Sequence, residues 1–476
     1  MTHDDSGSAP TTLIRGGTVV TESDRRRADV LCREGRIAAV GAALEPPAGD
    51  VRMIDASGCY VMPGGIDPHT HMQLPMMGTV VADDFFTGTA AAAAGGTTTI
   101  LDFVSPEPGQ SPLEALAIWR ERAAKATLYY GFHMVVSRWD EHFSGAMAAL
   151  VREHGIASFK FFLAYKGRLM LSDEELLAGF RRCRELGALA QVHAENGELI
   201  AYLQRKLLGE GVTTPLGHAL SRPPQCEGEA TSRAITIAEI VDVPLYVVHV
   251  SAAEAADAIA RARGRGVKVI GETLPGFLGI DDSVYRAPDF DFAAGHVMSP
   301  PYRPKAHQAA LWQAVQAGAL STTGTDHCSF TTAQKRLGLE DFTKIPNGCG
   351  GVEDRLQVLW QLGVNSGRLT PERFVALTSA NAAKTFNLWP RKGSLEVGAD
   401  ADLIVLDPQR TRIISAATQH QKTDFSVWEG MQLKGVVVHT LSRGRHVWAD
   451  GDLRAERGSG RYLARNPFGP AYEASV

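Results

Sequence analysis

Five side chains of metal-ligand type stand at or near the ends of β-rich segments. His69 and His71 form an HxH pair, and the two-residue period of a strand points both imidazoles to the same face. His193, His249 and Asp326 each come at the end of a later β-rich segment. If these segments are neighbouring parallel strands, the five side chains meet at one edge. Imidazole and carboxylate ligands together suit zinc or a similar first-row ion.

A lysine lies inside another of these β-rich segments. Lys160 falls in SFKFFLAY, on the same face as Ser158 and Phe162. A lysine is ordinarily a solvated surface charge, but this segment is apolar on both faces. Burial and nearby metal cations would lower the pKa of Lys160 and leave a free amine. A neutral amine binds only one ion, whereas a group that bridges two metals needs two oxygens.

The elements that must position these side chains alternate between strands and helices. Apolar residues at helical spacing occupy segments such as 112–126, 173–187 and 252–266. The β-rich segments between them are residues 60–71, 97–104, 128–136, 158–165, 189–196, 244–251, 267–272 and 320–327. Eight such repeats predict an α/β fold, a (β/α)8 TIM-like barrel with its reactive groups at the carboxyl ends of the strands.

The two ends of the chain differ in sequence pattern from the middle. Short β-rich stretches separated by glycine turns fill residues 11–63, and a similar pattern returns in residues 391–455. Each half is too small to stand alone, so we expect both to form one small β-sandwich domain. The barrel is then assigned to residues 64–390, and residues 456–476 form a C-terminal tail.

Composition and charge exclude several classes of protein. Hydrophobic residues make up 44% of the 476 residues and charged residues 21%, which is typical of a globular chain. A net charge of −5 without a dominant basic block argues against a nucleic-acid partner. The apolar run Ala90–Ala94 is far shorter than a membrane span of about 20 residues. An acidic, polar start and six scattered cysteines predict a cytoplasmic protein with reduced thiols.

Seven motifs, taken in their order, resemble one family of enzymes. They are HTH after GGIDP, SFKFFLAYKG, VHAENGELI, VVHVS, GHVMSPPYRP, TDHCSF and FTKIPNGCGGVEDR. Together they resemble the cyclic amidohydrolases, specifically the dihydropyrimidinase and hydantoinase family, over nearly the whole chain. An HxH pair in a barrel is common, whereas all these segments in this order are not.

The resemblance implies a two-metal centre bridged by a modified lysine. In that family CO2 carboxylates the lysine of the fourth strand, which supplies the two bridging oxygens, so Lys160 is expected to be N6-carboxylysine. The resemblance then implies two divalent ions, expected to be zinc. The implied ligands are His69, His71, Lys160 and Asp326 for one ion and Lys160, His193 and His249 for the other.

The activity that the resemblance implies is hydrolytic ring opening of cyclic diamides. The substrates would be 5,6-dihydropyrimidines such as dihydrouracil and 5-substituted hydantoins, and the products N-carbamoyl amino acids. A hydroxide held by the two metals would attack the ring carbonyl, while Asp326 moves its proton to the departing nitrogen. Tyr165 would stabilise the oxyanion, and backbone groups at Ser299 and Asn347 would hold the ureide part of the ring. The family also commonly forms homotetramers, in which the tail from Tyr462 could reach a neighbouring subunit.

Three alternatives stay open at this point. A dihydroorotase normally continues its first motif as HxHxR, but here Gln73 stands at the arginine position, which disfavours an acidic ring. An allantoinase is the second alternative. The third is a non-catalytic scaffold that resembles dihydropyrimidinase but has lost its ligands, although every ligand position is filled here.

Isolated histidines are more often structural than ligating, and we interpret five in this way: His133, His218, His296, His307 and His327.

Overall fold

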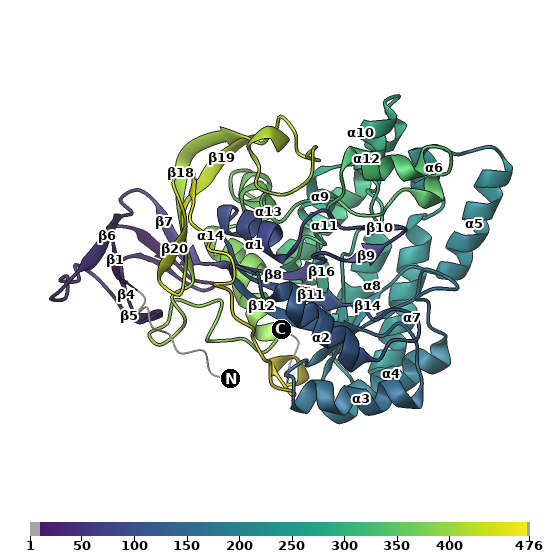
Figure 1. Ribbon diagram of the computed structural model, residues 1–476, viewed down its shortest axis with the longest axis horizontal. Coiled ribbons are helices and arrows are strands. Elements are labelled where there is room, and N and C mark those ends of the chain that lie inside the picture. Colours follow the sequence, from purple (N-terminus) through teal and green to yellow (C-terminus); the bar gives the residue numbers. More distant parts are fainter. Residues whose placement is uncertain (1–9, 474–476) are drawn as a thin grey trace.

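The centre of the molecule is a parallel barrel, seen in a computed structural model that describes residues 10–473 (Figure 1). Its eight strands follow the sheet order β17-β16-β15-β14-β13-β12-β11-β8. A parallel bridge between Thr70 of β8 and His327, four residues after the end of β17, closes the barrel. The strands are β8 (Gly65–Thr70), β11 (Thr97–Val104), β12 (Tyr129–Val135), β13 (Ser158–Phe162), β14 (Leu189–His193), β15 (Leu245–Val247), β16 (Val269–Thr273) and β17 (Leu320–Thr323).

Helices surround the barrel because their apolar faces pack on strands that are buried on both sides. Sequence signals set several helix starts: Ser172 and Glu175 form a capping box at the start of one helix, and Ser111 and Glu114 form one at another. The longer helices are α1 (Phe85–Ala94), α2 (Pro112–Ala123), α3 (Glu141–Arg152), α4 (Asp173–Leu186), α5 (Gly197–Gly209), α7 (Pro224–Val241), α8 (Ala253–Gly264) and α11 (Ala306–Ala317). The shorter ones are α6 (Pro215–Leu220), α9 (Pro275–Gly279), α10 (Phe290–Gly295), α12 (Thr332–Lys335), α13 (Arg355–Leu359), α14 (Pro371–Val375) and α15 (Asn381–Thr385).

Both ends of the chain build a β-sandwich beside the barrel (Figure 1). One sheet has the order β5-β4-β1-β6 and the other β21-β20-β19-β18-β7-β2-β3. Side chains from both sheets, including Val30 and Leu403, share one buried apolar cluster between them. The strands are β1 (Thr11–Arg15), β2 (Thr18–Val20), β3 (Arg25–Arg27), β4 (Asp29–Arg33), β5 (Arg36–Gly41), β6 (Val51–Asp55), β7 (Tyr60–Pro63), β18 (Leu403–Ile413), β19 (Gln432–Ser442), β20 (Arg445–Ala449) and β21 (Asp452–Leu453). The predicted fold, a TIM-like barrel with a sandwich from both chain ends, is confirmed.

One predicted strand proves to be two. The segment 60–71 was expected to be the first barrel strand, but β7 pairs with β18 in the sandwich and only β8 joins the barrel. The chain passes between the two sheets at Gly64, where a β-carbon would lie 2.3 Å from the Thr98 side chain. The close approach of a neighbouring barrel strand therefore requires glycine at this crossing.

The tail contacts its own barrel rather than extending away from it. Tyr130 N donates to Arg461 O over 3.0 Å, and Leu463 N donates to Tyr130 O over 2.7 Å. Further along, the Tyr472 hydroxyl donates to Ala188 O over 2.7 Å. These contacts lie at the amino-terminal ends of the strands, opposite the predicted site. That the tail from Tyr462 also reaches a neighbouring subunit stays a prediction, and residues 474–476 lie outside the described part of the chain. Within residues 10–473, no helix is both long and apolar enough to cross a bilayer.

Candidate metal centre

The six predicted ligands come together at the carboxyl ends of the barrel strands. His69 and Lys160 lie within β8 and β13, and His193 is the last residue of β14. His249 follows β15 by two residues, and Asp326 follows β17 by three. His69, Lys160, His193 and His249 are buried, and the side chains of His71 and Asp326 are 11% and 12% exposed. The parallel barrel therefore delivers ligands from five strands to one end, as expected for this architecture.

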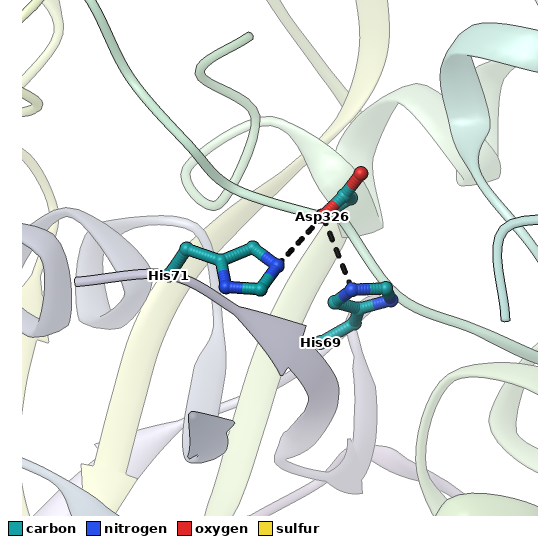
Figure 2. Close-up of side chains that lie close together, drawn as sticks. All are labelled: His69, His71 and Asp326. Carbon is teal, nitrogen blue, oxygen red and sulfur yellow. Dashed lines mark ion pairs between the residues drawn. The ribbon is translucent and has the colours of Figure 1, made fainter. Parts of the chain in front are cut away.

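Three of these ligands, His69, His71 and Asp326, lie close together. Asp326 Oδ1 lies 3.1 Å from His69 Nε2 and 3.1 Å from His71 Nε2, and Figure 2 shows the carboxylate directed at both rings. Their potential ligand atoms all lie within 4.8 Å of one another. Burial opposes ionisation of Asp326, but the two histidines hold the pKa of its carboxyl well below the usual range. Asp326 is thus a carboxylate that two imidazoles face.

Lys160 is the fourth member of this cluster. Its Nζ lies 2.9 Å from His69 Nε2. The ammonium end sits 4.3 Å from the ring centre of Phe103 and 5.2 Å from that of Phe162. Burial lowers the pKa of Lys160 to about 8, although the carboxylates of Asp326 and Glu272 oppose this. A substantial fraction of the amine is therefore neutral near physiological pH and able to act as a nucleophile.

His193 and His249 adjoin the same cluster through ring contacts. The centres of the two rings are 4.5 Å apart, and the His249 ring stacks on His69 at 5.4 Å. His193 Nε2 lies 2.8 Å from Glu195 Oε2, which leaves Nδ1 for another partner. His249 Nδ1 is buried and has no hydrogen-bond partner among the described residues.

Two carboxylates behind the histidines were not predicted from the sequence. Glu272 accepts from His69 Nδ1 over 2.8 Å and from the backbone N of His249 over 2.9 Å. Glu195 lies beside His193, and the Arg222 guanidinium donates to it over 2.5 Å. Such partners fix the tautomer and direction of a ligating imidazole. Their signal was present in the sequence, because Glu272 is a charge at the end of a β-rich segment and Glu195 follows His193 by two residues.

Glycine at position 324 is required by the closeness of His69 to Glu272. A β-carbon there would lie 2.8 Å from Glu272 Oε2 and 2.8 Å from His69 Cβ. Real β-carbons do not approach other atoms so closely, so a larger residue would displace this pair. The absence of a side chain at Gly324 thus maintains the orientation of the His69 ring.

The donor set fits a divalent cation. Glu272 Oε1 lies 2.8 Å from His69 Nδ1, so with a metal bound the ring proton would stay on Nδ1 and Nε2 would be the ligating atom. Burial lowers the pKa of His71 to about 4, which keeps this imidazole in the neutral form that metals bind. Burial opposes protonation of His69, but the Asp326 and Glu272 carboxylates raise its pKa, so the cluster attracts positive charge. Imidazole and carboxylate are ligands typical of zinc and related ions.

Three residues at this end of the barrel have a strained backbone. Tyr165, His249 and Asp326 have φ angles of 64°, 41° and 52°, a region that residues other than glycine seldom adopt. All three were predicted to be functional from the sequence. Strain of this kind persists where the surrounding structure imposes it and commonly accompanies functional sites.

The three predicted substrate-binding residues lie in loops above the barrel. The Tyr165 ring packs 5.2 Å from the His193 ring. Burial raises the pKa of Tyr165 to about 12, so its hydroxyl keeps its proton. The Ser299 hydroxyl lies near this phenol, but it is not in hydrogen-bond geometry and has no partner among the described residues. Asn347 is partly buried in the loop between β17 and α13.

The other histidines are engaged by the protein itself. His133 is buried, with Nε2 3.0 Å from Pro68 O and Nδ1 2.6 Å from Ser158 Oγ. His327 Nε2 lies 3.1 Å from Asp83 Oδ2. These contacts join neighbouring strands and loops, in agreement with a structural interpretation of both rings.

The fold and this site define a class of protein. The chain matches the model of the amidohydrolase family over residues 60–452, and it belongs to that family. It is similar to the dihydropyrimidinase of Rattus norvegicus, with 49% identity over 96% of this chain and 89% of the relative. It is also similar to the D-hydantoinase of Geobacillus stearothermophilus, with 47% identity over 96% of this chain and 97% of the relative. The crystal structure of a dihydropyrimidinase from Brevibacillus agri superposes with a TM-score of 0.94 at 47% identity, covering 96% of this chain and 99% of that one. The resemblance inferred from the sequence motifs is confirmed.

The carboxylate of Glu272 provides a test of the site that does not depend on substrate. In Glu272→Gln the side chain keeps its shape but loses the charge that accepts from His69 Nδ1. We expect metal affinity to fall by about 10- to 100-fold, measured as the chelator concentration that removes half of the bound metal. Glu353→Gln is the matched control, because Glu353 pairs with His420 away from the cluster. Equal chelator resistance of both variants would contradict the role of Glu272.

Proposed function

We propose that this protein hydrolyses cyclic diamides, opening 5,6-dihydropyrimidines such as dihydrouracil and 5-substituted hydantoins to N-carbamoyl amino acids. The observation that carries the proposal is the buried cluster in which His69, His71 and Asp326 meet beside the Lys160 amine. The similarity to a dihydropyrimidinase and a D-hydantoinase over nearly the whole chain supports it.

The proposed site holds two divalent ions, expected to be zinc, and a carbamate on Lys160. The neutral amine attacks the carbon of CO2, a C–N bond forms, and one N–H proton leaves, so that the side chain ends in two oxygens. His69, His71 and Asp326 would be ligands of one ion, His193 and His249 of the other, and the carbamate of both. Such a pair of ions would lower the pKa of bound water and polarise a carbonyl group.

The protein's own groups then have distinct tasks. Asp326 accepts a proton from the attacking water and delivers it to the ring nitrogen as the C–N bond breaks. The Tyr165 hydroxyl donates a hydrogen bond to the oxygen that becomes negative. Backbone groups at Ser299 and Asn347 bind the ureide part of the ring. Water and the cyclic amide together become one carboxylate and one N-carbamoyl group, so no other reactant is needed.

The alternatives predict different substrates or none. Gln73 at the end of the first barrel motif offers no cation to the carboxylate of dihydroorotate. Allantoin is the second competing ring. A scaffold without activity would lack some of the ligands, whereas all six positions carry ligating side chains here.

Quaternary state and location also belong to this proposal. We infer a homotetramer from the resemblance, and size-exclusion chromatography with light scattering measures its mass.

The six cysteines are all free, and five of them are buried. This pattern supports the reducing environment of the cytoplasm.

A side-by-side ring-opening assay tests the proposed function. The rings are dihydrouracil, hydantoin, phenylhydantoin, allantoin and dihydroorotate, each incubated with zinc-loaded protein and bicarbonate and analysed for its opened product. We expect dihydrouracil and the hydantoins to have the highest kcat/KM and a chelator to abolish turnover. Fastest turnover of dihydroorotate or allantoin would assign the alternative substrate, and no turnover of any ring would favour the scaffold.

A further inference from the structure

A second buried lysine lies near the site but makes no contact with the ligand cluster. Lys335 ends α12, and its side chain is fully buried. Its Nζ donates to three backbone carbonyls, Val297 O at 2.7 Å, Pro346 O at 2.8 Å and Gly348 O at 2.7 Å. These contacts use all three N–H bonds of the ammonium group.

The three acceptors flank both loops that the proposed function assigns to the substrate. Val297 precedes Ser299 by two residues, and Pro346 and Gly348 stand on either side of Asn347. Gly348 N also donates to Val297 O over 3.0 Å, so the two loops touch directly. One ammonium group therefore determines how far apart the backbones at Ser299 and Asn347 lie.

The residue before this lysine reaches a third loop at the same end of the barrel. Gln334 Nε2 donates to Thr79 Oγ1 and to Val80 O, both over 2.7 Å. Those acceptors belong to the hairpin of β9 (Pro75–Met76) and β10 (Thr79–Val80), which follows the HxH motif. Gln334 also caps α12 by accepting from Thr331 N over 2.8 Å. The short helix α12 thus links three loops.

The partners of Lys335 differ from those of the chain's other fully buried structural lysine. Lys392 lies over the Tyr129 ring at the amino-terminal end of the barrel, between two carboxylates, Asp400 at 2.8 Å and Asp402. Lys335 forms no ion pair with a carboxylate among residues 10–473, so the three carbonyl dipoles and the face of the Phe330 ring, 5.6 Å away, compensate its charge. Burial lowers the pKa of Lys335 to about 8. A buried cation without a carboxylate partner is costly, and its retention here is accounted for by the loops that it joins.

We propose that Lys335 is a positioning residue that sets the spacing of the Ser299 and Asn347 backbones and thereby selects rings that carry a ureide. This inference rests on the proposed function. The residue acts through the loops and does not touch the reacting atoms. Its removal should weaken recognition of the ureide while leaving the metal cluster and the chemical step in place.

Two rings that differ in one group test this role. Glutarimide has the imide and both carbonyls of dihydrouracil but a CH2 in place of the second N–H. In Lys335→Met we expect KM for dihydrouracil to rise about tenfold, which corresponds to the loss of one hydrogen bond. We expect kcat to stay within about threefold of the wild-type value. The kcat/KM for glutarimide should change by less than about threefold, so the preference for dihydrouracil over glutarimide falls. Metal content per chain should equal that of the wild type.

Lys392→Met is the matched control, because it removes a buried lysine at the opposite end of the barrel and should leave the preference unchanged. An unchanged preference in Lys335→Met, or an equal loss on both rings, would show that Lys335 is merely structural. If Lys335→Met does not fold, Lys335→Gln, which keeps two N–H donors, is measured in its place and should shift the preference in the same direction. Failure of the wild type on both rings would instead overturn the proposed function.

Discussion

Replacement of Lys160 by alanine is expected to lower kcat/KM for dihydrouracil by about 10³-fold or more, because ions that polarise the carbonyl contribute several kcal/mol to the rate. The variant loses the amine that lies 2.9 Å from His69 Nε2, and with it the proposed carbamate. Metal content per chain, measured on the same preparation, should fall as well. Isotope-labelled bicarbonate should give a carbamate signal in the wild type that the variant lacks.

Rescue of Lys160→Ala by short carboxylic acids distinguishes a variant that lacks only the bridging carbamate from one that is misfolded. Formate, acetate or propionate can place a carboxylate in the space that the lysine leaves, and we expect part of the activity and of the bound metal to return. Lys392→Ala is the control, since short acids should not help a variant whose defect lies at the opposite end of the barrel. Full activity of Lys160→Ala without any added acid would overturn the assignment of Lys160 as a metal bridge.

The barrel could be predicted from sequence because its strands are buried on both faces. Segments such as 97–104 and 158–165 are rich in β-branched and aromatic residues, so they indicate strands without reference to any tertiary contact. The division of 60–71 into β7 and β8 agrees with the predicted domain boundary between residues 63 and 64, but the β-rich pattern itself extends over the whole segment. The division depends on the close approach of Thr98 to Gly64, and these residues lie far apart in the sequence.

The ligands of the site were predictable because strand ends meet at one face of a barrel. Asp326 and His193 could be predicted as ligands from their positions at the ends of β-rich segments alone. Glu272 was missed although it ends a predicted strand, because its partner His69 lies on β8, far away in the sequence. Lys335 was missed for a different reason. It lies in the polar stretch TTAQK, which is typical of a solvent-exposed helix, and only the surrounding loops bury it.

Replacement of Tyr165 by phenylalanine is expected to lower kcat by about 10²- to 10³-fold, the usual effect of removing one oxyanion donor. The ring should keep its place against His193, because phenylalanine retains the packing and loses only the hydroxyl. Burial raises the pKa of Tyr165 to about 12. The phenol therefore remains a donor throughout the working range, and the ratio of wild-type to variant kcat should be constant from about pH 7 to about pH 10.

The outcome separates two roles that the hydroxyl can have. An oxyanion donor contributes in the transition state, so kcat falls while KM changes little. A group that binds the ring equally in the ground state would raise KM and leave kcat unchanged, and that result would remove Tyr165 from the chemical step. Tyr202→Phe is the control, since the Tyr202 side chain lies exposed on α5, and its kinetics should match the wild type. Metal content must also stay constant in Tyr165→Phe, because Tyr165 contacts the His193 ring and a displaced ligand would lower kcat for a different reason.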